Sequence, residues 1–174
     1  MATTKWTLDP THSEVLFKVK HLMITNVTGS FPVIKAEIET DGTDFSKGKV
    51  SFTADVTSVT TNNEQRDGHL KGADFFEVDK FPTIEFESTS LDIKNGKVKG
   101  NLTIKGITKP VTLDAEFHGT NKDPWGNEKA GFSVSGKIQR KDWDLNWNAA
   151  LETGGVLVSD DVKISADVQF VKAA

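Results

Sequence analysis

The chain has 174 residues, of which 36% are hydrophobic and 26% are charged, and its formal net charge is −4. This composition is typical of a water-soluble globular protein, and the length predicts one domain over residues 1–174. The acidic balance argues against a nucleic-acid-binding protein, which would carry a basic patch or stripe. The absence of cysteine excludes disulfides and thiol chemistry.

The N-terminal residues MATTKWTLDP lack the basic segment and apolar run of a signal peptide. We therefore expect a cytoplasmic protein, or a periplasmic or secreted one if a leader was removed. No apolar run approaches the roughly 20 residues that a membrane-spanning helix needs, so we expect no membrane span.

Alternation of apolar and polar residues, the pattern of a strand with one face on a core, recurs along the first third of the chain. Strands are predicted over residues 5–8, 14–21, 33–40 and 49–57. Residues 22–31 are predicted to be a connection between the second and third of these strands.

Residues 62–82 are the only part of the chain that reads as neither strand nor short turn. An irregular insert in a β pattern is where we expect a site, because rigid strands hold the loop and the loop carries chemistry. A short helix is predicted here, capped by Asn62 or Asn63 and ending near Gly72. The residues that share one face of this helix are Arg66, His69 and Leu70.

The second half of the chain returns to the strand pattern. Strands are predicted over residues 83–93, 97–105, 108–120, 129–139 and 161–172. A bulge near residues 88–90 would restore the inward register of the first of them. Asn95-Gly96 is a strong hairpin signal, and residues 140–159 are predicted to be a long loop.

About eight strands with short connections favour an all-β antiparallel meander. A curved sheet with one apolar face can close into a barrel, which removes its exposed edges. An eight-stranded barrel is either filled by its own side chains or holds one small ligand. The sequence therefore predicts an antiparallel eight-stranded β-barrel with one short helical insert.

Small residues such as Ala36, Ala54 and Ala115 fall on the inward side of the predicted strands and would leave volume in the barrel. Phenylalanines fall on the same side. They either fill that volume or line a ligand cavity, and the residues alone favour the filled core, because most apolar strand faces are simply core.

Four segments, in order along nearly the whole chain, resemble the YceI-like family. They are R-x-x-H-L-K-x-x-D-F-F-E-V-x-x-F-P-x-I-x-F over 66–86, Trp6–Pro10 followed by His12-Ser13, Val27–Phe31, and Gly100–Gly106 continuing to Lys109-Pro110-Val111. One position departs from the family pattern, because Asp144 stands where such proteins usually have glycine.

The resemblance implies a lipocalin-like barrel that binds a long amphiphile, either a polyisoprenoid or a fatty lipid, in an elongated cavity. It also implies a homodimer. The side chains expected to line the cavity are Phe17, Val19, Phe31, Ile38, Phe52, Ala54, Phe75, Phe76, Phe86, Leu102, Ile104, Phe117, Phe132, Val134, Ile138, Trp143, Trp147 and Phe170.

Arg66, His69 and Arg140 are candidates for contact with a phosphate or carboxylate head group, since arginine offers a planar fork to such oxygens. Structural roles remain open for each arginine. Arg66 would otherwise lie on a solvated helix face or pack against Asp67 or Glu64. The alternative for Arg140 is an ion pair with Asp142 or Asp144.

Trp143 and Trp147 lie in the long loop and would form either a lid over the barrel mouth or a flap on its exterior. The four histidines match no metal-ligand spacing, so we expect neither a metal nor a cofactor.

We expect a non-enzymatic protein that carries or sequesters a long-chain lipid. The alternatives are an enzyme that acts on such a lipid through Arg66 and His69, and a stress-linked interaction module with a filled core.

Overall fold

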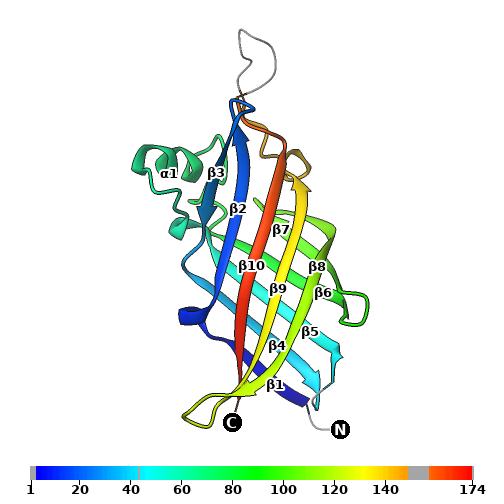
Figure 1. Cartoon of the computed structure of the whole chain (residues 1–174). Helices are drawn as coiled ribbons and strands as arrows, with labels where there is room; N and C mark the ends of the chain where they lie inside the picture. The colour runs from blue at the N-terminus through cyan, green and yellow to red at the C-terminus, as the bar shows by residue number, and fades with distance from the viewer. Residues whose placement is uncertain (1–2, 43, 149–156, 174) are drawn as a thin grey trace.

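The computed structural model describes residues 3–42, 44–148 and 157–173, which wrap into one barrel with a helix at one end (Figure 1). The strands are β1 (Thr3–Leu8), β2 (Glu14–His21), β3 (Thr25–Ser30), β4 (Ile34–Asp41), β5 (Asp44–Asp55), β6 (Thr83–Asp92), β7 (Lys97–Ile104), β8 (Ile107–Lys122), β9 (Glu128–Gln139) and β10 (Asp161–Lys172). The helices are α1 (Glu64–Lys71) and the short 3-10 helices η1 (Pro10–His12), η2 (Val56–Ser58) and η3 (Arg140–Trp143).

The sheet closes on itself because β10 pairs with β9 along one edge and with β1 on the other. The ring runs β1, β4, β5, β6, β7, β8, β9 and β10, and every neighbouring pair in it is antiparallel. The predicted eight-stranded antiparallel barrel is therefore confirmed.

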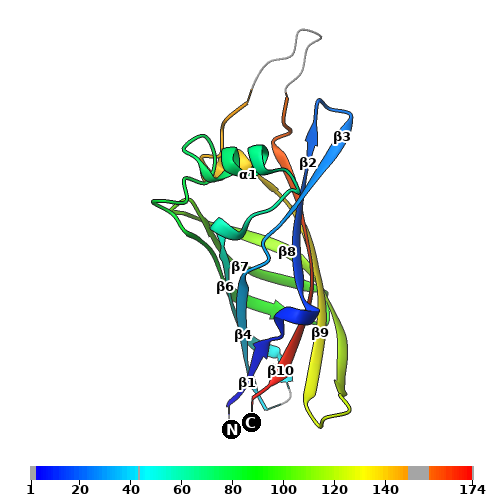
Figure 2. The same ribbon diagram turned by 90° about the vertical axis from the view of Figure 1, so that its left-hand side faces the viewer.

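Strands β2 and β3 form a hairpin outside this ring. β2 pairs with residues 163–167 of β10, whereas β1 pairs with residues 170–172 of the same edge. The hairpin rises beyond the barrel on the side of α1 (Figure 2). The prediction of a connection over 22–31 was wrong, because residues 25–30 form β3. This strand pairs along its length with β2 alone and carries little apolar surface, so the alternation that marks the other strands is missing.

A bulge in β6 lies where the sequence places it, between Ser88 and Ser90. The hydroxyl of Ser88 accepts a 2.8 Å hydrogen bond from the backbone N–H of Val50 on the neighbouring strand. Because of the extra residue, Phe86 and Leu91 are both buried although they lie on opposite parities of the sequence.

Aromatic side chains close the end of the barrel at which β1 begins and β10 ends. Phe45 has its ring centroid 5.0 Å from that of Trp6 and 4.9 Å from that of Phe117. Phe132 lies 4.9 Å from Phe117 and 6.0 Å from Phe170. These five rings form a continuous packed floor, which we call the aromatic floor.

The opposite end of the barrel is covered by α1 (Figure 2). Asn63 is its N-cap, with the side-chain oxygen accepting the N–H of Arg66 at 3.0 Å, and Gly72 follows its last residue as predicted. A bridge between Ser30 and Thr60 ties the end of β3 to the segment that leads into the helix. The helix is therefore tied at the mouth to the β2–β3 hairpin.

Asp9 organises the break between β1 and β2. Its carboxylate caps η1 through the N–H of Thr11, accepts a hydrogen bond from His12 at 2.8 Å, and pairs with Lys129 of β9 at 2.7 Å. The Lys129 ammonium, followed by His12 and Thr11, holds the pKa of Asp9 far below its usual range. One carboxylate thus joins the kink to the opposite side of β10.

We expect Asp9→Asn to lower the free energy of unfolding at neutral pH by about 2 kcal/mol. Because the folded-state pKa of Asp9 lies below its unfolded value of about 4, its contribution is complete above that pH and is lost as the pH falls below it. Urea unfolding at neutral and at acid pH should show that the difference in unfolding free energy between variant and parent is smaller in acid. Asp79→Asn, at an exposed position, is the control; an equal difference at both pH values would contradict the role of Asp9.

Candidate functional site

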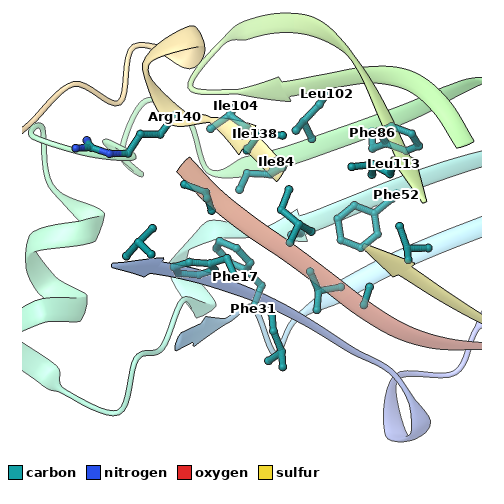
Figure 3. Close-up of a pocket in the computed structure, with 18 of the residues that line it drawn as sticks. Phe17, Phe31, Phe52, Ile84, Phe86, Leu102, Ile104, Leu113, Ile138 and Arg140 are labelled. Carbon is teal, nitrogen blue, oxygen red and sulfur yellow. The ribbon is translucent and has the colours of Figure 1, made fainter. Parts of the chain in front are cut away.

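A cavity of about 400 Å³ lies inside the barrel between the aromatic floor and α1 (Figure 3). Apolar side chains make up nearly all of its wall. Among the side chains expected there, those that line it are Phe17, Val19, Phe31, Ile38, Phe52, Ala54, Phe75, Phe76, Phe86, Leu102, Ile104, Phe132, Val134, Ile138, Trp147 and Phe170. The barrel is therefore not completely filled by its own side chains, although contact of these residues with a ligand stays a prediction.

Two expected residues lie elsewhere. Phe117 belongs to the aromatic floor, behind Phe132, and does not reach the cavity. Trp143 is buried in η3 and donates a 2.9 Å hydrogen bond from Nε1 to the carbonyl of Leu102, so it packs as core. Only Trp147 of the two loop tryptophans lines the cavity.

Small residues contribute unequally to the open volume. Ala36, Ala54, Ala115 and Ala166 all line the cavity, as their inward parity suggests. The glycines do not, because their neighbours cover them: a Cβ on Gly100 would lie 2.5 Å from the Phe86 ring. Volume therefore comes from the alanines, and Gly100 serves close packing.

The mouth of the cavity is formed by aromatic rings from two separate segments. Phe75, which follows α1, and Trp147, which follows η3, have ring centroids 5.5 Å apart. His69 packs edge-on against both, at 5.0 Å from Phe75 and 4.8 Å from Trp147. Its Nε2 also hydrogen bonds to Asp74 at 2.9 Å. These contacts join the helical insert to the loop after η3 across the opening.

Arg66 lies at the same mouth with an exposed side chain. It donates from Nε to the hydroxyl and from one terminal nitrogen to the carbonyl of Thr61, both at 2.7 Å. Asp67 also accepts hydrogen bonds from Thr61, so Thr61 holds both charged side chains in place. A guanidinium has five N–H donors, and within the described part of the chain only Thr61 accepts from this one.

Arg140 lines the cavity but is 3% exposed and turned toward backbone. It donates to the carbonyls of Leu145 and Trp147 at 2.6 and 2.8 Å, and to those of Ser159 and Val158 at 2.9 and 3.3 Å. The carboxylate nearest to it is Asp160, at 3.8 Å, rather than Asp142 or Asp144.

Burial lowers the pKa of Arg140, and Asp160 opposes that effect. The side chain thus ties together the two ends of the segment that runs from η3 to β10.

Several lining residues were missed by the sequence reasoning. Lys20 and His21 line the cavity from β2, which was predicted as a strand, and Val27 lines it from β3, which was predicted as part of a connection. Leu157 and Val158 do so from the predicted loop. The alternation of β2 placed Lys20 on the face opposite Val15, Phe17 and Val19 and so gave no signal for it, because the extension of the cavity up this strand depends on β3.

The ionisable side chains described along the cavity wall are all basic. Among the described residues, the polar side chains that line the cavity are Lys20, His21, Arg66, His69 and Arg140, with no aspartate or glutamate. Figure 3 shows Arg140 near α1, whereas Phe52, Phe86 and Leu113 lie farther along the barrel. The cavity therefore combines an apolar interior with basic side chains toward the mouth.

Over the described residues, no group of three or more histidine, aspartate or glutamate side chains is placed to hold a metal ion. None of the described helices is long and apolar enough to cross a membrane.

A family model, that of the YceI-like domain, matches residues 6–170. The chain belongs to the YceI-like family. UPF0312 protein SA2479 of Staphylococcus aureus strain N315 is 45% identical over 168 residues, which cover 96% of this chain and 97% of that protein.

Solved structures share the YceI-like fold. The Campylobacter jejuni YCEI protein is 36% identical, with a TM-score of 0.75 over 89% of this chain and 90% of that one. BcnA of Burkholderia cenocepacia, at 22% identity, has a TM-score of 0.79 over 93% and 98% of the two chains. A polyisoprenoid binding domain from Saccharophagus degradans, at 16% identity, has a TM-score of 0.71 over 97% and 98%.

Asp144 shows why the YceI-like pattern has glycine at this position. It ends η3 in the left-handed conformation, with φ of 61° and its N–H donated to the carbonyls of Arg140 and Lys141. Aspartate tolerates this region better than most residues, so the turn persists with the substitution.

We expect Arg140→Met to lower the free energy of unfolding by about 3 kcal/mol, because it strands buried carbonyls and removes the cation next to the buried Oδ1 of Asp160, whose other oxygen faces Lys141. Arg140→Lys should recover only part of this loss, since one ammonium cannot span four carbonyls. Lys141→Met removes the exposed cation that pairs with the other oxygen of Asp160 and should stay within about 0.5 kcal/mol of the parent, because exposed ion pairs contribute little. Chemical denaturation measures all three, and a stable Arg140→Met variant would argue against the structural role.

Proposed function

We propose that this YceI-like protein binds a long-chain amphiphilic lipid, with the hydrocarbon in the barrel and the head group at the mouth. The protein carries or sequesters the lipid and does not transform it. The observation that carries this proposal is the apolar cavity that opens between basic side chains.

Burial of hydrocarbon supplies the affinity. Each Å² of apolar surface removed from water contributes about 25 cal/mol before the costs of ordering are counted. The aromatic floor limits how deep a chain can go, and the alanines on the wall set the width. Among long-chain lipids, the family resemblance favours a polyisoprenoid, and one protein that shares the fold is a polyisoprenoid binding domain. The same resemblance supports a homodimer, which analytical ultracentrifugation would test.

The basic mouth supports an anionic head group, a phosphate or a carboxylate. Arg66 is the best placed of the three candidates, because its fork is held by Thr61 on one side only. Arg140 contributes positive charge, but its N–H groups are already donated to four carbonyls. His69 is packed between two rings and bonded to Asp74.

Chemistry on the bound lipid is a second candidate function. A carboxylate beside a histidine, as in Asp74 and His69, is an arrangement that can orient a general base. Two sets of contacts argue against this role for His69. Its Nε2 is already hydrogen bonded to Asp74, and its ring packs edge-on against Phe75 and Trp147. An enzyme would release an altered lipid, and His69→Ala would abolish the alteration while keeping binding.

Organic extraction of the purified protein followed by mass spectrometry tests the carrier function directly. We expect a stoichiometric isoprenoid or fatty lipid, chemically unaltered. Ala166→Phe projects a ring into the cavity and should reduce lipid uptake about tenfold or more. Ser165→Phe adds a ring at the next position of β10, which is exposed, and is the matched control. An empty extract, with no uptake of added polyprenyl or fatty chains, would refute the proposal.

Removal of the Arg66 charge tests the head-group assignment. Arg66→Gln should weaken binding of a polyprenyl phosphate about tenfold and leave binding of the corresponding neutral alcohol unchanged, because only the former gains a charge-assisted hydrogen bond. Lys80→Gln, an exposed lysine away from the cavity lining, is the control. Equal losses for the phosphate and the alcohol would assign Arg66 to the structure of the mouth instead.

A further inference from the structure

The hairpin of β2 and β3 ends in an apolar tip formed by Leu22, Met23 and Ile24. These side chains are 40%, 50% and 79% exposed. The tip rises above the mouth, beyond α1 (Figure 2). Three adjacent large apolar residues at the end of a projecting hairpin stand apart from the polar turns that usually join strands.

The backbone of the tip makes this choice of residues costly. Leu22 and Met23 have φ of 55° and 63°, and the N–H of Ile24 bonds to the carbonyl of His21 at 3.2 Å. Both central residues of this His21–Ile24 turn have positive φ, as in the type I′ turn for which Asn-Gly is the favoured sequence, and Ile24 lies between the turn and Thr25, which pairs with His21. A leucine and a methionine there carry a steric penalty that asparagine and glycine would avoid.

The tip is continuous with the cavity. His21, which precedes it, and Val27, which follows it on β3, both line the cavity. The N–H of Leu22 bonds to the carbonyl of Leu157 at 2.8 Å, and His21 forms a bridge with Val158. A lipid that leaves the mouth on this side would therefore pass along the hairpin.

A row of lysines crosses the outer face of the sheet below the tip. Lys163 of β10 lies directly opposite Lys18 of β2 on one side and Lys137 of β9 on the other. All three are exposed, and only Lys137 has a carboxylate within 4 Å among the described residues, Asp161 at 3.6 Å. Like charges in direct register are unfavourable, so the row is not explained by the stability of the barrel.

Lys20, which is exposed and also borders the mouth of the cavity, continues this row toward the tip. It lies two residues before Leu22 on β2, about 7 Å along the strand, while Lys18 lies about 13 Å away. Apolar groups of interfacial proteins enter the head-group region by about 5–10 Å. With the tip inserted to that depth, Lys20 would lie at the level of the lipid phosphates and Lys18 within about a Debye length of them.

We propose that the hairpin tip docks on the surface of an anionic lipid bilayer, with Leu22, Met23 and Ile24 in the interface and the lysine row beside the phosphates. The mouth then faces the bilayer, and lipid passes between membrane and cavity along β2 and β3. This exchange rests on the proposed lipid-carrying function, whereas the docking itself does not need an occupied cavity. The apolar tip matches the apolar part of a bilayer interface, and the basic row matches its anionic phosphates.

Flotation with vesicles tests the docking. The protein should float with vesicles that contain about 30% phosphatidylglycerol in phosphatidylcholine and much less with phosphatidylcholine alone, because each lysine near an anionic surface adds attraction. High salt should release it as the Debye length shrinks to about 3 Å. Equal binding to both vesicles, binding to neither, or displacement by free inorganic phosphate would overturn the proposal.

The double variant L22N/M23G separates docking from folding. It installs the preferred turn sequence, so thermal stability should rise or stay unchanged, while vesicle binding falls about tenfold or more. Trp125→Asn removes another exposed apolar side chain, 83% exposed, from the β8–β9 turn. That variant should bind vesicles like the parent. Unchanged binding by L22N/M23G would overturn the proposal.

A charge pair tests the lysine row. K18E/K163E should reduce binding to anionic vesicles about thirtyfold, whereas K47E/K94E, with the same change in net charge at exposed positions outside the row, should have little effect. Equal losses for the two variants would show that only net charge matters and would overturn the role of the row.

Two further outcomes keep this proposal distinct from the proposed function. Ala166→Phe should still float with vesicles although its cavity is blocked, so an empty extract with normal flotation would refute the carrier and leave docking intact. Tip-dependent self-association in sedimentation, without vesicle binding, would assign the tip to a second copy and overturn membrane docking.

Discussion

Strand β10 pairs with β9 over residues 161–171, but its other edge is divided between two partners. Near the C terminus it pairs with β1, and this pairing closes the ring. Farther back it pairs with β2, which leads into the β3 hairpin instead of continuing around the barrel. The break between the two partners is held by Asp9, whose carboxylate binds η1 and Lys129 together. One edge of one strand therefore decides that the barrel is sealed at one end and open at the other.

This asymmetry between the two ends of the barrel determines where the apolar and the charged side chains lie. At the sealed end the strands converge and five aromatic rings fill the interior. At the other end the hairpin diverges from the ring, and the space between is spanned by α1 and the loop after η3. The basic residues of the mouth come from α1, η3 and the end of β2, since charged groups tolerate the partly open end and would be costly among the rings. An elongated apolar cavity with a charged rim follows from where the sheet closes.

Alternation along the strands was enough to predict the barrel, because one buried face imposes a period of two on most of its strands. It failed for β3, which is bonded along its length on one side only. Alternation also does not show how far along the barrel axis a side chain lies. Phe117 and Phe132 were both predicted to point inward, yet only Phe132 lines the cavity. Parity reports which face a residue occupies, whereas the floor of a cavity depends on how strands converge, and that is set by pairings far apart in the chain. The same limit applies to Arg140, whose four carbonyl partners lie in loops without a local signal.

The two arginines show how burial separates structural from functional charge. Arg140 is deeply buried, and a guanidinium there must satisfy its donors within the protein, which it does with four carbonyls. Arg66 is exposed at the rim, so its remaining donors can be satisfied by water until a ligand displaces it. A head group that replaced this water would accept the same hydrogen bonds, and the described side chains that line the cavity include no carboxylate to repel it. The apolar wall would hold the hydrocarbon chain without fixing which end of the lipid enters first. The basic rim would set the orientation of the lipid by binding its head group.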